Sequence, residues 1–388
     1  MKKLFFCLTF FLFSTIAFTS VSGAAQGITE TPDVKIVIEG KKVIYSDVPI
    51  NVDGRIMLPL REVLTNLGVK NDNEHIIWDN AKKSVTVKKD DKIIYLEAGN
   101  KVATVNGEKF TVDVPPIIYP KNNRTYIPAR FVAESMDKQV VWDAETRSVL
   151  ISDKESYNRI KDLLDKSTIA MKEAKKFKFG MKDENKFLAN ESDSEMTFDL
   201  KGEIDLKNKA FHMVNAQNIS DDKYIFEFSL VDGCDYYYDK KSGWNKIILS
   251  QSELEEYDDF FRNFDKLLIL TEKDIEKISA GLVIIESDNP DEIVIEGDAL
   301  AYEYKKAITR FLNSGLEGTD EIALTELLMM GENINDPYMK LTLDKNNYCV
   351  KEIVMSMACL VRGELQVNSK VSAYFEDING DFEIIAPQ

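Results

Sequence analysis

The sequence predicts an α+β protein in which a duplicated ββαββ domain precedes a curved antiparallel half-barrel sheet with covering helices. Three observations lead to this prediction. A proline-x-arginine motif and a tryptophan-aspartate pair each occur twice, in the same order, near the start of the chain. Alternating apolar and polar runs dominate the later part, and amphipathic helical patterns interrupt them. A chain of 388 residues also favours two or three domains over one compact core.

The first 24 residues have the pattern of an export signal. Lys2 and Lys3 form a basic start, an apolar run extends from Leu4 to Phe18, and small residues follow at 22–25. The run is short for a membrane span, although an uncleaved anchor is the alternative, and no later stretch has the roughly 20 apolar residues that a span needs. We expect a signal peptide at residues 1–24, a linker at 25–33, and a secreted or surface-associated mature chain without a transmembrane span.

Composition restricts the classes of partner. The formal net charge of −17 predicts a surface that repels nucleic acid, so we expect no nucleic-acid partner. Cleavage of the signal would leave an odd number of cysteines, Cys234, Cys349 and Cys359, which is not a disulfide framework. We expect buried thiols, with a Cys349–Cys359 bridge as the alternative.

The strongest signal is the internal repeat between residues 34 and 153. In each copy an alternating strand leads to a proline at the expected first helical position, where its missing N–H costs little. A short amphipathic helix follows, which Gly68 ends in the first copy, and then two strands. One copy is too small to bury both faces, so we expect the two to form one domain. The motif residues are Pro59, Arg61, Trp78 and Asp79 in the first copy, and Pro128, Arg130, Trp142 and Asp143 in the second.

The repeated arginines and tryptophans allow functional and structural interpretations. Arg61 and Arg130 could clamp a ligand, or each could order its own repeat by pairing with Asp79 or Asp143. The tryptophans could stack on glycans or lie in the core between helix and sheet. Because both pairs are duplicated symmetrically, we expect the structural roles.

Residues 34–153 resemble the copper amine oxidase N-terminal domain family, also called the stalk domain. The shared pattern is the doubled proline-x-arginine, helix and tryptophan-aspartate order described above. The resemblance implies an exported adaptor or spacer, not amine oxidation. Copper amine oxidases use three histidine ligands and a tyrosine-derived quinone, whereas this chain contains only two histidines. We therefore expect no enzyme activity, no metal and no cofactor.

Residues 155–388 form the second predicted domain. The sequence predicts a helix that ends near residue 176, and then strands and helices in turn. The predicted strands lie at 177–188, 196–206, 210–219, 224–231, 235–248 (a hairpin), 338–344, 350–358, 364–375 and 382–385, and the later helices at 252–264, 271–278, 302–313 and 319–330.

This region resembles the lipoprotein-carrier-like fold of the LolA and LppX type. The resemblance is carried by the opening helix, the Gly243-Trp244-x-Lys246 segment and the closing run from Tyr374 to Ile384. It implies a helix-covered apolar face that can hold an acyl chain or a hydrophobic partner. We expect Tyr304, Phe311, Leu327, Met329 and Met330 to line that face, although the same residues would be acceptable in a closed core.

These observations favour an exported, non-catalytic cell-envelope protein. The stalk domain would present a C-terminal domain that binds an apolar or envelope-derived ligand, with a lipid or an envelope component as the partner. The alternatives are a purely structural surface or adhesion component and a carboxylate-based wall-polymer hydrolase, because the abundant carboxylates could supply a glycosidase pair.

Overall fold

The computed structural model describes residues 27–144, 146–188, 193–219, 222–268, 270–298, 332–361 and 365–388. The fold is α+β, with mostly antiparallel strands and five helices among these residues. The predicted signal peptide and the predicted helices at 302–313 and 319–330 lie outside the described residues.

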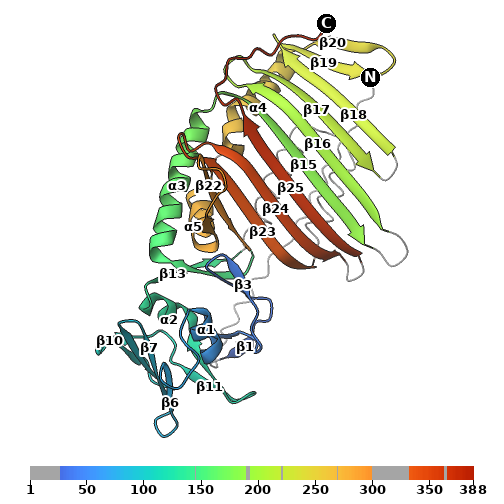
Figure 1. The fold of residues 1–388 in the computed structure, drawn as a ribbon. Helices are drawn as coiled ribbons and strands as arrows, with labels where there is room; N and C mark the ends of the chain where they lie inside the picture. Colours follow the sequence, from blue (N-terminus) through green and yellow to red (C-terminus); the bar gives the residue numbers. More distant parts are fainter. Residues whose placement is uncertain are drawn as a thin grey trace, which may run out of the picture.

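The N-terminal part contains three small sheets and two short helices (Figure 1). The first sheet has the order β1(Ile28–Glu30), β4(Ile50–Val52), β5(Arg55–Pro59), β12(Arg124–Pro128), β11(Ile117–Tyr119). The second has the order β10(Glu108–Thr111), β9(Val102–Val105), β8(Lys92–Glu97), β7(Ser84–Lys89), β6(Ile76–Asp79). The third has the order β13(Lys138–Asp143), β14(Ser148–Asp153), β2(Lys35–Ile38), β3(Lys41–Val43). Helix α1(Leu60–Asn66) follows β5, and α2(Ala129–Ser135) follows β12.

The two prolines of the repeated motif stand immediately before their helices. Pro59 and Pro128 are the N-cap residues of α1 and α2, one position earlier than predicted. The structural reason for proline holds at either position, because the first N–H groups of a helix have no intrahelical partner. Gly68, with φ of +84°, follows α1 in the left-handed conformation, as predicted; Asp137, with φ of 58°, takes the corresponding place after α2.

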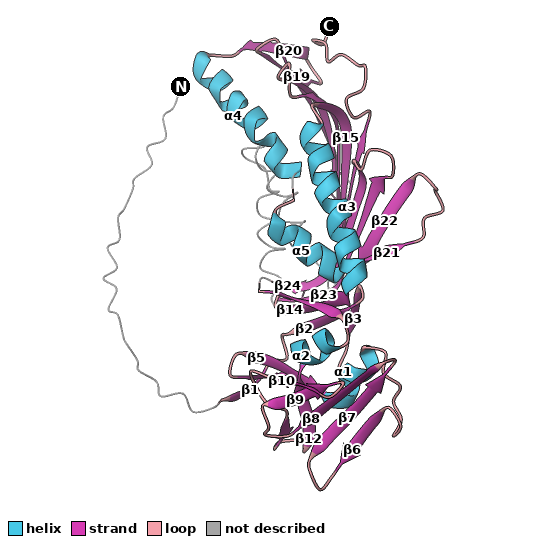
Figure 2. Ribbon diagram, turned by 90° about the vertical axis from the view of Figure 1, so that its left-hand side faces the viewer, coloured by secondary structure: helices cyan, strands magenta, loops and turns pink. Residues whose placement is uncertain are grey.

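The C-terminal part is built around one eleven-stranded antiparallel sheet that curls into a half-barrel (Figure 1). Its order is β20(Gly243–Ile248), β19(Cys234–Asp239), β18(Asp222–Val231), β17(Ala210–Ile219), β16(Ser194–Asp205), β15(Lys176–Leu188), β25(Leu365–Glu376), β24(Val350–Val361), β23(Glu332–Asp344), β22(Glu292–Gly297), β21(Val283–Ile285). Helices α3(Lys154–Glu173), α4(Gln251–Leu268) and α5(Glu272–Gly281) lie on one face of the sheet (Figure 2). We call this the helix face and the opposite one the outer face.

Helix α3 begins immediately after Asp153 and ends at Glu173, three residues before the predicted end. The segment after Asp153 reads as a polar junction in the sequence, but it forms the first turn of the helix. The Asp153 carboxylate caps this turn, accepting hydrogen bonds from the N–H groups of Glu155 and Ser156, each at 3.0 Å. Ile160, Leu164 and Met171 then form a buried stripe toward the sheet.

Two further features differ from the prediction. The short strands β21 and β22 were not predicted, and they extend the sheet beyond β23. The predicted closing strand at 382–385 does not form. Strand β25 has β15 on one side and β24 on the other, so both of its edges are already paired. The Phe382 ring instead lies beneath the ammonium groups of Lys176 and Lys178, at 4.5 and 5.1 Å.

The third sheet of the N-terminal part packs on α3 and α5. Val37 and Leu150 from this sheet belong to the same buried cluster as the core of the large sheet. Lys277 of α5 forms a 2.8 Å ion pair with Asp143 of β13, and both side chains are buried. At the turn between β2 and β3, the N–H of Asp298 donates to the carbonyl of Gly40 at 2.7 Å. The two parts therefore share a continuous, partly polar interface.

These contacts correct the expected arginine pairs. Asp143 pairs with Lys277 and not with Arg130. Arg61 donates to the side-chain oxygen of Asn71 at 3.1 Å, while Asp79 accepts from the backbone N–H groups of its own turn. The Asp143 carboxylate thus joins the two parts of the chain through Lys277, and within its own turn it also accepts a hydrogen bond from the Thr146 hydroxyl.

Candidate functional site

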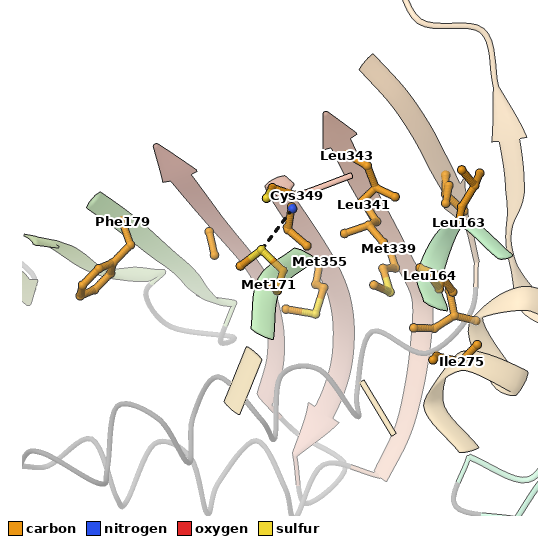
Figure 3. Packing of buried hydrophobic residues seen from close by; sticks show 14 of the residues in the cluster. Leu163, Leu164, Met171, Phe179, Ile275, Met339, Leu341, Leu343, Cys349 and Met355 are labelled. Carbon is orange, nitrogen blue, oxygen red and sulfur yellow. Dashed lines mark hydrogen bonds between the residues drawn. The ribbon is translucent and has the colours of Figure 1, made fainter. Parts of the chain in front are cut away.

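One half of the helix face is a closed apolar core. Leu163 and Leu164 of α3 point toward Leu341 of β23, and Met171 lies beside Met355 of β24 (Figure 3). The backbone N–H of Val350 even donates to the Met171 sulfur at 3.4 Å. Side chains in this region are buried and in mutual contact, which is the packing of an ordinary protein interior.

The β18–β20 end of the same face is open. Strand β18 places Leu230, Phe228, Phe226 and Tyr224 on the helix face in alternation, beginning in the core beside Phe211. Along this series the side chains become progressively less covered. Phe226 and Tyr224, with Tyr237 of β19 and Ile247 of β20, are 45–47% exposed. We call these four residues the open rim.

Helix α4 marks where the core ends. Phe260 and Phe261 pack on Phe211, with ring centroids 6.1 and 6.2 Å apart. The Tyr257 hydroxyl donates to the Asp235 carboxylate of β19 at 2.8 Å, which ties the helix to the strand. Burial raises the pKa of Asp235 above its usual range, and the hydrogen bond from Tyr257 opposes this shift. Burial first, and then the bond to Asp235, raises the pKa of Tyr257.

Polar side chains stand at two places on the helix face near the open rim. Asp183 and Asn185 of β15 lie beside Ser369 of β25, and Asn215 and Gln217 lie on β17, with the apolar Met196, Phe198 and Leu200 of β16 between the two groups. We call these five polar residues the polar band. Asn185 and Asn215 are 1% and 2% exposed. The Asn185 amide donates to the Asp183 carboxylate at 3.0 Å. The side-chain oxygens of Asn185 and Asn215 are buried without a hydrogen-bond partner.

Register places this band beside the rim. Asn215 lies directly opposite Phe226, and Gln217 lies directly opposite Tyr224. Across the next two strands, Gln217 faces Phe198, which in turn faces Asp183. Directly opposite residues on one face have Cβ atoms about 4.5–5.5 Å apart. Apolar and acceptor groups therefore meet at one location on the sheet.

Sequence reasoning missed the polar band, although a signal was present. The helix-face positions of β15 read Phe177, Phe179 and Met181, and then change to Asp183 and Asn185. The residues predicted to line the face, Tyr304, Phe311, Leu327, Met329 and Met330, lie outside the described residues, so their role stays a prediction.

The repeated tryptophans do not lie in the core as expected. Trp78 and Trp142 are 36% and 39% exposed. Their strands, β6 and β13, are the edge strands of the second and third sheets, which leaves part of each ring uncovered. The expectation of core packing is therefore wrong for both.

Histidines and cysteines in the part of the chain that the structure describes are paired or at least partly buried. Within the described ranges, no group of three His, Cys, Asp or Glu side chains is placed to hold a metal ion. His212 pairs with Glu227 at 3.0 Å, and His75 pairs with Asp72 at 2.7 Å in a distant loop. Cys349 is a buried free thiol whose pKa burial raises, so the alternative Cys349–Cys359 bridge is wrong. No helix in the described part of the chain is long and apolar enough to cross a membrane.

The N-terminal part of the chain matches a known family of protein domains. Residues 37–151 match the copper amine oxidase N-terminal domain, as the repeated motif indicated. The matched domain is the N-terminal, non-catalytic domain of those oxidases. No curated protein matches the chain.

Solved structures match the chain over part of its length. LprF from Mycobacterium bovis is 10% identical, with a TM-score of 0.33, over 59% of this chain and 97% of that chain. Lipovitellin, in a structure described by its lipid-protein interactions, is 11% identical, with a TM-score of 0.25, over 55% of this chain and 26% of that chain. A LolA superfamily protein from Nitrosomonas europaea is 9% identical, with a TM-score of 0.15, over 56% of this chain and 91% of that chain. The LolA superfamily, which the sequence resembles, is thus among the structural neighbours.

Proposed function

We propose that this chain is an exported, non-catalytic cell-envelope protein whose stalk domain, residues 34–153, presents a ligand-binding domain, residues 155–388. The ligand is apolar or amphiphilic and binds at the open rim. One observation carries the proposal: four large apolar side chains on the helix face remain nearly half exposed, while the other half of the same face is a closed core.

Exposure of this kind is costly unless it serves binding. Burying apolar surface contributes about 25 cal/mol per Å², and contiguous exposed apolar patches on soluble proteins mark interaction sites. The rim is continuous with the core through Phe228 and Leu230, so a bound chain would extend an existing apolar layer. The signal-like N-terminus and the net charge of −17 support export and solubility.

The internal repeat of the stalk domain supports its proposed role of presenting the second domain. We infer that its two ββαββ units are related by an approximate two-fold axis. In the pairing of β5 with β12, Leu58 faces Ile127, Pro59 faces Tyr126 and Met57 faces Pro128. Exchange of the two units maps these pairs onto one another. Superposition of the units in an experimental structure tests this inference.

Binding at the rim is tested with the neutral fluorescent probe N-phenyl-1-naphthylamine. We expect the mature protein to bind the probe, and Phe226→Ser to weaken binding about tenfold, since a buried aromatic contributes roughly 1.5–3 kcal/mol. Ile225→Ser is the matched control, because Ile225 is the next residue on β18, equally exposed at 46%, but on the outer face. Native mass spectrometry of protein purified from its host would show a co-purified ligand.

Two results would overturn the proposal. If the probe does not bind and no ligand co-purifies, a purely structural surface or adhesion component becomes the better description. Equal losses in the two variants would place the probe outside the helix face.

A further inference from the structure

We propose that one corner of the large sheet, on β18–β20, docks on the surface of a lipid bilayer. This corner presents apolar and aromatic side chains on both of its faces, and we call it the aromatic corner. It consists of Tyr224, Ile225 and Phe226 of β18, Tyr237 and Tyr238 of β19, and Trp244 of β20. The proposal goes beyond the proposed function, because a ligand at the open rim uses the helix face alone and a bilayer also reaches the outer face.

Exposure on both faces is the first step. Successive residues of a strand point to opposite faces of a sheet. On β18 three consecutive large side chains, at positions 224–226, are exposed, and on β19 two consecutive ones, at positions 237 and 238, are exposed. All five are 45–46% exposed. The corner is therefore apolar on its two sides at once, which differs from the one-sided exposure of an ordinary binding groove.

The outer side of the corner is built around an aromatic pair. Tyr238 lies directly opposite Trp244, and their ring centroids are 5.6 Å apart in an edge-on arrangement. Ile225 alternates to the same face, while Tyr237, opposite Phe228, lies on the helix face. A ligand held between the sheet and its helices would leave this outer side in water. A fluid surface that closes around the corner covers both sides.

The residue types fit the boundary between lipid and water. Tyrosine and tryptophan combine an apolar ring with one polar group, and they are enriched at the level of the lipid headgroups. Four of the six residues of the aromatic corner are of these two types. Ile225 and Phe226 add purely apolar surface, whose transfer from water contributes about 25 cal/mol per Å².

The open edge of the sheet limits the depth of docking. Strand β20 is the edge strand. The N–H of Leu249 donates to the carbonyl of Gly233, so in the antiparallel alternation Trp244 and Lys246 direct their backbone groups away from β19. Free N–H and C=O groups are too costly to place in hydrocarbon. They keep partners among headgroups and water, which places the corner in the headgroup region.

Charge and position favour this corner over the rest of the surface. Lys240 and Lys241 occupy the exposed turn between β19 and β20, and Lys223 precedes Tyr224. Residues 221–223 and 239–241 together contain three lysines and three aspartates, so this part is neutral in a chain of net charge −17. Anionic lipid repels the remaining surface more strongly than the corner. Strands β19 and β20 also lie at the end of the molecule opposite the stalk domain (Figures 1 and 2).

The fluorescence of Trp244 tests the docking directly. The chain has three tryptophans, so Trp78→Phe with Trp142→Phe leaves Trp244 as the only one. With vesicles of phosphatidylcholine and phosphatidylglycerol, we expect its emission to shift to shorter wavelength and to be quenched when the phosphatidylcholine carries bromine on the upper part of its acyl chains. The matched control is Trp78→Phe with Trp244→Phe. It leaves Trp142 of the stalk domain, which is 39% exposed and should keep its emission.

Outer-face variants separate docking from ligand binding. Ile225→Ser combined with Tyr238→Ser should weaken co-sedimentation with the vesicles about tenfold, since two large apolar side chains are lost from the contact. Binding of N-phenyl-1-naphthylamine without vesicles should be unchanged, because both residues lie on the outer face. Ile44→Ser, at an isoleucine of the N-terminal part that is 87% exposed, is the control and should sediment like the unchanged protein.

Each contrary result has a distinct meaning. If the probe binds but vesicles leave the Trp244 emission unchanged, the docking inference is wrong and the proposed function stands. If vesicles bind but the probe does not, the proposed function fails and the docking inference stands. Equal quenching of Trp142 would place the contact elsewhere on the chain. A dimer in solution that the outer-face variant dissociates would assign the corner to a second copy of the chain, and the docking inference would again be wrong.

Discussion

At the residue scale, the surroundings of an aspartate decide whether folding raises or lowers its pKa. Asp235 is half-buried beneath α4, and its pKa is raised. Asp239, four residues further along β19, accepts hydrogen bonds from the N–H groups of Lys241 and Ser242, which lower its pKa. Folding therefore favours the protonated form of Asp235 and the ionised form of Asp239.

These shifts predict opposite pH dependences. A raised pKa in the folded state means that the native protein binds the proton more tightly than the unfolded chain does. The contribution of Asp235 to the free energy of unfolding therefore falls as pH rises above about 4. Asp239 contributes stability that is present above about 4 and lost as pH falls. In urea unfolding between pH 3 and pH 7, Asp235→Asn should gain free energy of unfolding relative to the unchanged protein as pH rises, and Asp239→Asn should lose it. Parallel trends in the two variants would contradict the assignment.

Residue-scale prediction from sequence succeeded where a position had one dominant physical constraint. Gly68 is an example, because a left-handed residue ends α1. It failed for Trp78 and Trp142, since apolar size alone predicts burial while the edge position of their strands decides exposure. Asp143 could not be paired from sequence, because its partner, Lys277, is remote in the chain.

At the element scale, alternation located most strands of the large sheet. Strand β17 has the predicted bounds, and β15 and β16 begin one and two residues before theirs. The short strands β21 and β22 have too few residues to show a period, and they form by pairing with β23. The helix start at Thr271 was predicted correctly because a cap is a local signal.

The capping box of α5 gives an element-scale prediction. The Thr271 hydroxyl accepts from the Asp274 N–H at 3.2 Å, and the Asp274 carboxylate accepts from the Thr271 N–H at 3.0 Å. Thr271→Ala should lower the free energy of unfolding by about 1 kcal/mol, measured by urea denaturation. Thr271→Ser keeps the hydroxyl and should change it by less than half as much. An equal loss in the serine variant would indicate that the methyl group, and not the cap, is responsible.

At the scale of the whole molecule, the two parts are joined by more than a linker. Val37 and Leu150 of the third sheet complete the apolar cluster beneath α3 and α5. Gly297 of β22 approaches the turn after β2 so closely that an added Cβ would lie 2.7 Å from the Gly40 carbonyl oxygen. The sequence pattern predicted two separate domains, and it could not show this junction, because each contact joins segments that are far apart in the chain.

The junction predicts that the mature chain unfolds in a single calorimetric transition, since neither part keeps its full core without the other. Lys277→Met should remove the ammonium group that pairs with the buried Asp143 carboxylate, at a cost of about 3–5 kcal/mol. Gly297→Ala should force the β2–β3 turn away from β22, at about 1–3 kcal/mol. Either variant should separate the transition into two, because the interface is weakened while each sheet keeps its own pairing.

Lys161→Met is the control, since Lys161 forms an exposed pair with Asp165 at 3.4 Å that contributes little. Two transitions in the unchanged protein would mean that the stalk and the large sheet are independent, and that the stalk acts only as a tether.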